Sequence, residues 1–148
     1  MNLATKSTTM LWNEAYETGN NEVDRQHKEL FRLVEKVIDG EFSGRQEKID
    51  HVVDFLIKYV GYHFDYEEKL MDECGFPNTL TAKHKGQHKA FVADSQKLKE
   101  TIVQQGYTLD MSLTINETVV SWLTDHIMGS DRELAEFYKK WLKESKGK

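Results

Sequence analysis

Residues 49–74 read IDHVVDFLIKYVGYHFDYEEKLMDEC, and the spacing of their apolar residues predicts one long helix. The same helical face passes through His63 and Glu67, where a buried face would ordinarily carry leucine or valine. The apolar side chains on this face recur every three or four residues, at Val53, Leu56, Val60, Leu70 and Cys74. The stretch therefore predicts a helix that packs into a core and brings two polar side chains into it.

Three further segments show the same periodicity, and short stretches of helix-breaking residues separate the four segments. Clusters rich in glycine or proline fall at residues 40–44, 75–78 and 105–107. In the segments at 23–38, 79–104 and 115–126 the apolar faces also run through histidines, namely His27, His84, His88 and His126. Long helices joined by short loops favour antiparallel neighbours. We therefore expect an all-α protein, an up-down-up-down antiparallel four-helix bundle.

The segment before the first helix is expected to differ from the bundle. Residues 11–20 lack a clear helical period but carry Trp12 and Tyr16, two large aromatic side chains. We expect them to form an irregular arm packed on the bundle. Residues 1–10 are expected to be a disordered tail, which leaves residues 11–148 as one domain.

The segment after His126 carries signals of a helix end and a new start. Gly129 is suited to a left-handed helix C-cap, and Ser130 with Glu133 has the spacing of a capping box. We therefore expect the fourth helix to break at Gly129 and a short C-terminal helix to follow at residues 131–143.

Composition and charge narrow the class of protein. The chain has 148 residues, of which 39% are hydrophobic and 30% charged, with one proline, as expected of a compact helical domain. Its formal net charge of -5 argues against a nucleic-acid partner and against direct binding to an anionic membrane. Cys74 is the lone cysteine, so no intramolecular disulfide can form, and a reducing cytoplasm fits best.

Five of the six histidines lie on the inward faces of the predicted helices, together with Glu67. One such histidine is ordinarily a core imidazole satisfied by a hydrogen bond. Five imidazoles and a carboxylate would each need a partner in a dry core, whereas bound metal satisfies all of them together. His51 is the exception, because a position twelve residues before His63 points about 120° away from that face. The pattern predicts a metal site built from His27, His63, Glu67, His84, His88 and His126.

Asp131 is a seventh candidate ligand, and its position leaves two interpretations open. It lies five residues beyond His126, where an unbroken helix would turn it about 140° away from the ligand face, so binding metal requires a break at Gly129. An aspartate in the first turn of a new helix also complements the helix dipole without any metal. Cys74 lies on the inward face of its helix and is expected to pack in the core.

The number and type of candidate ligands predict the kind of metal centre. Five histidines and two carboxylates are too many for one ion but suit two octahedral ions that share the carboxylates as bridges. With one solvent-derived oxygen also bridging, all but one coordination position is filled. A set rich in imidazole and poor in carboxylate suits iron better than calcium or magnesium, and two irons with one vacancy can deliver two electrons to a small ligand such as dioxygen. The chain has no Glu-x-x-His or Cys-x-x-Cys pair, which other metal sites use.

These residues resemble the hemerythrins, in particular the bacterial single-domain bacteriohemerythrins. The resemblance extends from Leu11 to about Trp141. It rests on DRQHKELF at 24–31, HFDYEE at 63–68, GFP at 75–77 followed by His84 and His88, and the stretch from Trp122 that ends in HIMGSD at 126–131. It implies a four-helix bundle that holds a non-haem, oxo- or hydroxo-bridged di-iron centre.

The resemblance also assigns roles to the candidate ligands. His84, His88 and His126 would bind one iron ion, His27 and His63 the other, and Glu67 with Asp131 would bridge both. Dioxygen would bind at the vacancy on the second iron. Residues 11–148 are thus expected to be a hemerythrin-like di-iron domain, in which His51 and Cys74 receive no role from the family.

Three functions are compatible with such a centre. The leading hypothesis is reversible dioxygen binding by a monomeric oxygen carrier, store or delivery module, which is not an enzyme and has an oxygen-consuming enzyme as a candidate partner. An oxygen- or redox-sensing domain is the second, and a peroxide or nitric oxide reductase the third. The sequence supplies no evident general acid or electron-donor site, which argues against the reductase. The expected apolar walls of the dioxygen site are Phe31, Trp122, Leu123 and Ile127.

Overall fold

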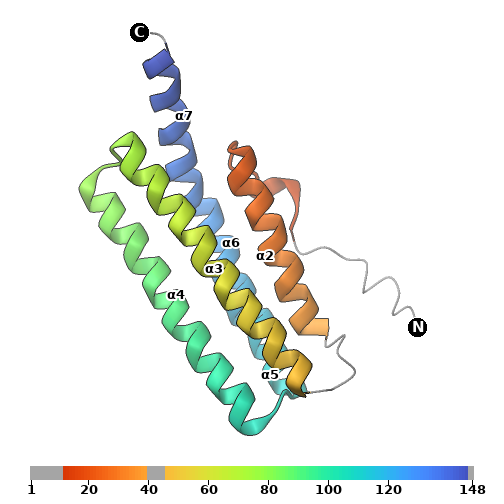
Figure 1. The fold of residues 1–148 in the computed structure, drawn as a ribbon. Helices are drawn as coiled ribbons and strands as arrows, with labels where there is room; N and C mark the ends of the chain where they lie inside the picture. Colours follow the sequence, from red (N-terminus) through yellow and green to blue (C-terminus); the bar gives the residue numbers. More distant parts are fainter. Residues whose placement is uncertain (1–11, 40–45, 147–148) are drawn as a thin grey trace.

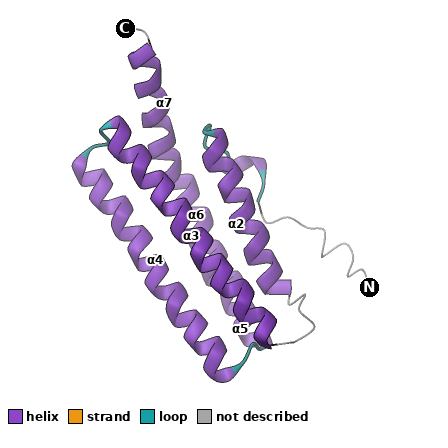
Figure 2. Ribbon diagram, in the orientation of Figure 1, coloured by secondary structure: helices purple, strands orange, loops and turns teal. Residues whose placement is uncertain are grey.

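The computed structural model describes residues 12–39 and 46–146, and the described chain is almost entirely helical (Figure 1, Figure 2). A short 3-10 helix, η1 (Glu14–Tyr16), precedes α2 (Asn21–Asp39), α3 (Gln46–Cys74) and α4 (Asn78–Gln105). An unbroken helical stretch follows, made of α5 (Leu109–Thr114), η2 (Ile115–Val119), α6 (Val120–His126), η3 (Ile127–Asp131) and α7 (Arg132–Lys146). The described residues contain no strand, so the all-α class is confirmed.

The four long helical stretches lie side by side and alternate in direction (Figure 1). α3 packs against both α2 and α4, and the last stretch closes the bundle with α5 beside α2 and α7 beside α3. Gly75 and Gly106 adopt positive φ angles of 67° and 83° at the turns where the sequence predicts helix ends. The up-down-up-down antiparallel four-helix bundle is therefore confirmed, while the breaker cluster at 40–44 lies outside the described residues.

Apolar side chains form two buried clusters that flank the predicted metal ligands along the bundle. On α2, His27 lies between Val23 of the smaller cluster and Leu30 of the larger one. The smaller cluster consists of Val23, Leu70, Met71, Cys74, Phe76 and Leu134. The larger cluster consists of Leu30, Phe31, Val34, Val37, Val53, Val60, Phe64, Phe91, Ile102, Ile115, Leu123 and Ile127. The core packing expected for Cys74 is confirmed.

The described part of the N-terminal arm packs on the bundle as expected. Trp12 and Tyr16 contact the larger cluster, and Tyr16 stacks on Phe31 with ring centroids 5.7 Å apart. Arg132 of α7 donates hydrogen bonds to two main-chain carbonyl groups of the arm. The tail expected at residues 1–10 and the first arm residue lie outside the described residues.

The expected helix break at Gly129 is wrong. Gly129 has no positive φ angle, and the helix continues from α6 through the π-helical turn η3 into α7. Ser130 does not cap a new helix, because its hydroxyl group donates a hydrogen bond to Gln87 Oε1 of α4, 2.8 Å away. A π turn accommodates one extra residue while the main-chain hydrogen bonds continue, so no cap is needed. The helix expected at 131–143 is α7, a continuation rather than a separate element.

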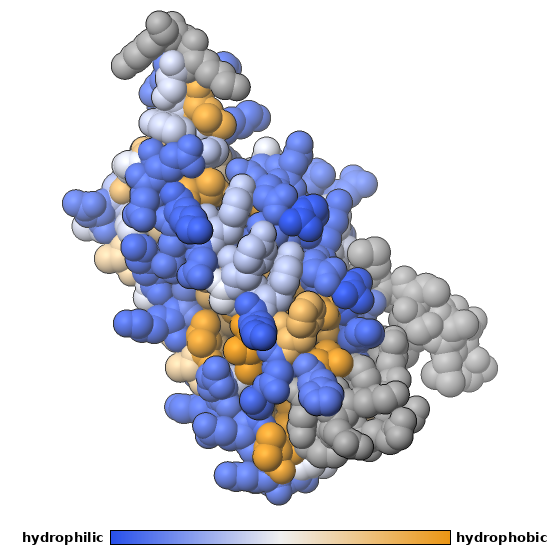
Figure 3. Space-filling model, viewed as in Figure 1, coloured by the Kyte–Doolittle hydropathy of each residue, from blue (hydrophilic) through white to orange (hydrophobic). Residues whose placement is uncertain are grey.

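Hydrophilic residues cover most of the molecular face in Figure 3, and apolar patches gather in the lower half of that view. Among the described residues, the large apolar side chains that are exposed are Phe55, Tyr62, Val103, Leu109, Leu113 and Met128. Within the described part of the chain, no helix combines the length and hydrophobicity needed to cross a membrane.

Candidate metal centre

Seven polar side chains meet inside the bundle, at the level between the two apolar clusters. Their relative exposures range from 0% for His27 and Glu67 to 6% for His126. α2 supplies His27, α3 supplies His63 and Glu67, α4 supplies His84 and His88, and the last helical stretch supplies His126 and Asp131. The structure brings together all seven residues that the sequence predicts, and leaves His51 exposed. That the seven bind metal stays a prediction.

The seven side chains form two overlapping groups, each small enough to surround one ion. One group is Glu67, His84, His88, His126 and Asp131, and the other is His27, His63, Glu67 and Asp131. In each group the potential ligand atoms all lie within 4.8 Å of one another. Glu67 and Asp131 belong to both groups, as expected of carboxylates that could bridge two ions.

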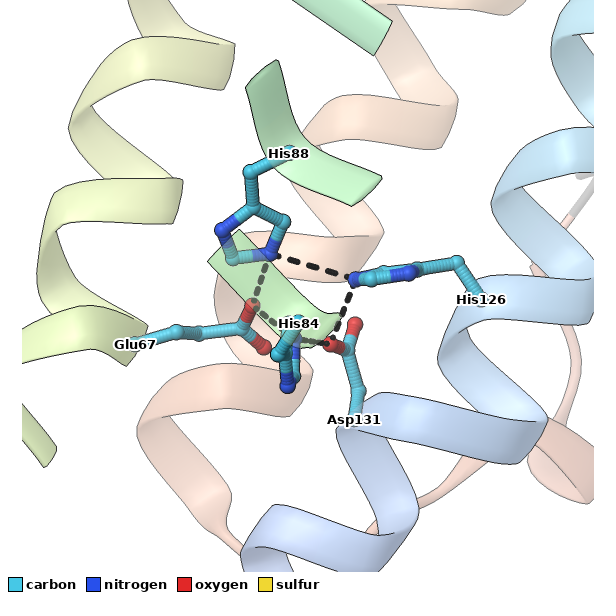
Figure 4. A group of neighbouring side chains, drawn as sticks. All are labelled: Glu67, His84, His88, His126 and Asp131. Atoms are coloured by element: carbon cyan, nitrogen blue, oxygen red, sulfur yellow. Dashed lines mark hydrogen bonds and ion pairs between the residues drawn. The ribbon is translucent and has the colours of Figure 1, made fainter. Parts of the chain in front are cut away.

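In the group with three histidines, the Nε2 atoms converge on the two carboxylates (Figure 4). His84 Nε2 and His126 Nε2 lie 2.9 and 3.0 Å from Asp131 Oδ1. His88 Nε2 lies 3.1 Å from Glu67 Oε1 and 3.2 Å from His126 Nε2. Two unprotonated imidazole nitrogens so close would repel each other, and a shared cation would remove that repulsion.

The group with two histidines is looser. His27 Nε2 lies 2.9 Å from Asp131 Oδ2 and 3.8 Å from Glu67 Oε2. His63 Nε2 lies 3.5 Å from Glu67 Oε2. The two rings meet edge to face, with centroids 4.7 Å apart. Fewer imidazoles thus face this half of the centre.

The π turn η3 is what brings Asp131 to the same face as His126. The two residues are five positions apart, and η3 spans Ile127–Asp131 between them. A π-helical turn pairs residues at i and i+5, so it places side chains five positions apart one above the other. This geometry removes the angular mismatch that an ordinary α-helix would impose. The sequence therefore predicts correctly that Asp131 joins the other candidate ligands. It predicts the wrong cause, because a π turn and not a helix break brings Asp131 there.

Buried polar atoms that lack a hydrogen-bond partner indicate whether these side chains fit a metal ion. His27 Nε2, Asp131 Oδ2 and both carboxylate oxygens of Glu67 are buried and have no hydrogen-bond partner among the described residues. They lie near other polar atoms, but without hydrogen-bond geometry. Burying unpartnered polar atoms costs several kcal/mol. A mixed imidazole and carboxylate set offers the donors that iron binds, so the residues present fit a metal ion.

Burial keeps two of the histidines ready to bind metal. Loss of solvation, reinforced by neighbouring imidazoles, holds the pKa of His63 well below its ordinary value. The same causes lower the pKa of His88 to about 2. Both rings are therefore neutral at physiological pH, the form in which imidazole binds a metal.

The two shared carboxylates have opposite pKa shifts. Burial, together with the nearby Asp131, raises the pKa of Glu67 well above its ordinary value. Burial alone would also raise the pKa of Asp131, but interactions with His126 hold that pKa well below its ordinary value. Without a cation the buried pair therefore disfavours two negative charges, whereas a cation would allow both to ionise.

Two further side chains contact the histidines from outside, and sequence reasoning did not assign them a role. Gln26 Oε1 accepts a hydrogen bond from His63 Nδ1 at 2.7 Å, and Glu68 Oε2 accepts one from His88 Nδ1 at 3.0 Å. Gln26 is fully buried. A glutamine next to a candidate ligand on a buried helix face is the only sequence signal that could have indicated its role.

On the side of the larger cluster, aromatic rings stack on two histidines of the centre. Three of the four expected wall residues, Phe31, Leu123 and Ile127, are fully buried there. The fourth, Trp122, stacks on His126 with ring centroids 4.5 Å apart. Phe64, which sequence reasoning missed, stacks on His88 at 3.7 Å. An apolar cavity of about 30 Å³ borders this wall at Leu123 and extends along the bundle.

Comparison with known proteins places this arrangement in a family. Residues 18–138 match the family model of the hemerythrin HHE cation binding domain. The chain belongs to the hemerythrin family. The matched range includes all seven residues of the two groups, so the hemerythrin resemblance predicted from the sequence is confirmed.

Named relatives agree with the family assignment. A bacteriohemerythrin of Stenotrophomonas maltophilia is 26% identical over 133 residues, which cover 90% of this chain and 84% of the relative. A hemerythrin-like protein of Naegleria gruberi is 30% identical over 124 residues, which cover 81% of this chain and 86% of the relative. A crystal structure of wild-type hemerythrin matches with a TM-score of 0.72 and 28% identity, covering 86% of this chain and 95% of that one. The bundle is thus a hemerythrin fold.

Proposed function

We propose that this hemerythrin binds dioxygen reversibly at a non-haem di-iron centre, as an oxygen carrier, store or delivery protein. The observation that carries the proposal is the pair of overlapping ligand groups that share two buried carboxylates. Membership of a family named for cation binding supports it. Two groups with shared members suit two adjacent ions rather than one.

The residues that would hold the metal divide unequally between the two halves. His84, His88 and His126 would hold one iron ion, His27 and His63 the other, and Glu67 and Asp131 both. When bound, two ferrous ions supply the two electrons that dioxygen takes up. The imidazole-rich set supports reversibility, because only two carboxylates are present to stabilise the ferric state.

The side chains around the centre have a separate task, which is to keep water and protons away. Phe31, Leu123 and Ile127 present no hydrogen-bonding group and are 1%, 3% and 1% exposed. The apolar cavity of about 30 Å³ that Leu123 helps to line is large enough for one small molecule. An apolar surround slows the irreversible oxidation that would end reversible binding.

An optical spectrum recorded through a cycle of gases tests the proposal. The iron-loaded protein is reduced without oxygen, exposed to air and then purged with inert gas. We expect a visible charge-transfer band that appears in air and disappears on purging, over several cycles. Direct conversion to a permanently oxidised spectrum would contradict reversible binding, and rapid turnover of peroxide or nitric oxide with a reductant would favour catalysis instead.

Location, assembly and partner stay predictions from the sequence. We propose a cytoplasmic monomer, because a lone buried cysteine fits a reducing compartment. An oxygen-consuming enzyme is the partner that a delivery role requires. A sensing role would require a protein that responds to the oxygenated state.

A further inference from the structure

Two of the five histidines are held from behind by a neighbouring side chain, and the two neighbours differ in charge. Gln26 accepts the hydrogen bond from His63 Nδ1, and Glu68 accepts the one from His88 Nδ1. Nε2 of each ring faces the carboxylates of the centre. A neutral imidazole that donates from Nδ1 has its lone pair on Nε2. Both contacts therefore select the tautomer that can bind metal through Nε2.

The orientation of the Gln26 side chain is fixed from its other end. Its Nε2 donates a hydrogen bond to Glu22 Oε2, 2.8 Å away. A carboxylate can only accept, so the amide nitrogen of Gln26 must face Glu22 and the amide oxygen must face His63. The chain of hydrogen bonds from His63 through Gln26 to Glu22 therefore has only one consistent assignment of donors and acceptors.

Glu22 stays a carboxylate because Arg25 holds it. Arg25 donates two hydrogen bonds to Glu22, at 3.0 and 2.5 Å. The hydrogen bonds from Arg25 and Gln26 lower the pKa of Glu22 to about 2. Two turns further along α2, Arg32 holds Glu29 in the same way, at 2.9 and 2.7 Å. Among the contacts of the described residues, none joins this second pair to the centre, so the pair provides a matched control.

We propose that Gln26 and Glu68 are positioning residues that fix the tautomers of His63 and His88 and make the two halves of the metal centre electronically unequal. The proposal rests on the di-iron function proposed above. A carboxylate that accepts the outer proton makes an imidazole a stronger donor to metal than a neutral amide does. The half with His88 therefore stabilises a higher metal charge, and the half with His63 binds its ion more weakly.

Zinc binding tests the tautomer part of the proposal without iron or dioxygen. We would measure zinc affinity by competition with a chelator, and the ring ¹⁵N chemical shifts of His63 in the zinc-loaded protein. Gln26→Leu should weaken zinc binding at the second site about 10- to 100-fold and shift the His63 ring nitrogens. Unchanged shifts and affinity in Gln26→Leu would overturn the proposal.

A surface substitution keeps this test informative even if Gln26→Leu fails to fold. Glu22→Gln replaces an acceptor-only group with one that can also donate, so Gln26 is no longer held in one orientation. We expect a smaller shift in the same direction for Glu22→Gln and none for Glu29→Gln. Equal effects of these two variants would show that the Arg25 pair acts only on the helix and would overturn the proposal.

Glu68→Gln tests the charge part, since it keeps a hydrogen-bond acceptor and removes the negative charge. The His88 ring shifts should be retained in the zinc-loaded variant, whereas the reduction potential of the iron-loaded protein should rise. Glu100→Gln removes the same charge from an exposed position of α4 and should leave the potential unchanged. Equal reduction potentials for the two variants would overturn the proposed electronic difference between the two halves of the centre.

The outcomes separate this inference from the proposed function. Failure of the zinc measurements would count against the positioning residues and leave dioxygen binding untouched. A protein that behaves as expected with zinc but shows no reversible band in air would contradict the proposed function alone.

Discussion

His63 and His51 show how much a single helical position decides. Both lie on α3, twelve residues apart, yet His63 is 1% exposed and belongs to the candidate metal centre, whereas His51 is exposed. The 3.6-residue period alone separates them, because twelve residues do not complete a whole number of turns. The chain therefore contains its own comparison between a histidine in the centre and one outside it.

His63→Ala should lower iron content and change the optical spectrum, because it removes one of two imidazoles from the looser half of the centre. His51→Ala should alter neither property. Metal analysis and absorption spectra of the two variants, prepared in parallel, check this prediction. Equal loss of iron from both would contradict the assignment of His63 as a ligand.

Leu123→Asn should speed irreversible oxidation in air several-fold without emptying the centre. Leu123 is buried in the larger cluster, and an amide there would admit water and protons to the apolar wall. Leu113→Asn makes the same change at a side chain that is already 51% exposed, and should have no effect. The measurement is the rate at which the reversible band decays in air. Equal decay rates would show that the wall does not protect the centre.

Residue periodicity predicts side chains that point inward, but it does not identify contacts between helices. It brings the five histidines and Glu67 to the core from spacing alone. It gives no role to Gln26 or Phe64, because each contacts a histidine on another helix. Gln26 meets His63, and Phe64 meets His88, only when the helices pack together. Polar contacts of this kind depend on side-chain orientation, which a one-dimensional pattern does not contain.

At the scale of elements, the last helical stretch is where local signals and packing disagree. Gly129 and the spacing of Ser130 and Glu133 favour a helix end, yet η3 carries the helix through. Local propensity is weak compared with tertiary packing, and Leu134 of α7 is buried in the smaller cluster. The C-terminal ends of α3 and α4 were predictable because Gly75 and Gly106 adopt positive φ angles at the turns that follow these helices.

Gly129→Ala should stabilise the protein by up to about 1 kcal/mol, because glycine inside a helix is destabilising relative to alanine. An added Cβ atom would meet nothing within 4 Å. Gly75→Ala should instead destabilise by about 1–2 kcal/mol, since its φ of +67° is strained for alanine. Urea unfolding of both variants measures these changes. Destabilisation by Gly129→Ala would indicate a helix break after all.

At the scale of the whole molecule, the candidate centre joins all four helical stretches at one level of the bundle. Each stretch contributes at least one of the seven side chains, so bound metal would link the whole fold. The two apolar clusters on either side supply the packing that holds these side chains in place before metal arrives. Metal binding should therefore be coupled to global stability.

Removing metal should lower the melting temperature, and reloading should restore it. A ligand present at about 100 times its Kd stabilises the folded state by about 2.7 kcal/mol. For a chain of this length such a change corresponds to about 5–10 °C. Calorimetry of the metal-free and metal-loaded protein, with His51→Ala as the control, checks this prediction. Identical melting temperatures would mean that the buried polar groups are satisfied without metal.

The metal content of the purified protein tests the central claim most directly. Protein expressed with ample iron is analysed for all transition metals and for chain concentration. The two overlapping ligand groups predict about two iron ions per chain. One zinc ion per chain and no iron would contradict the account.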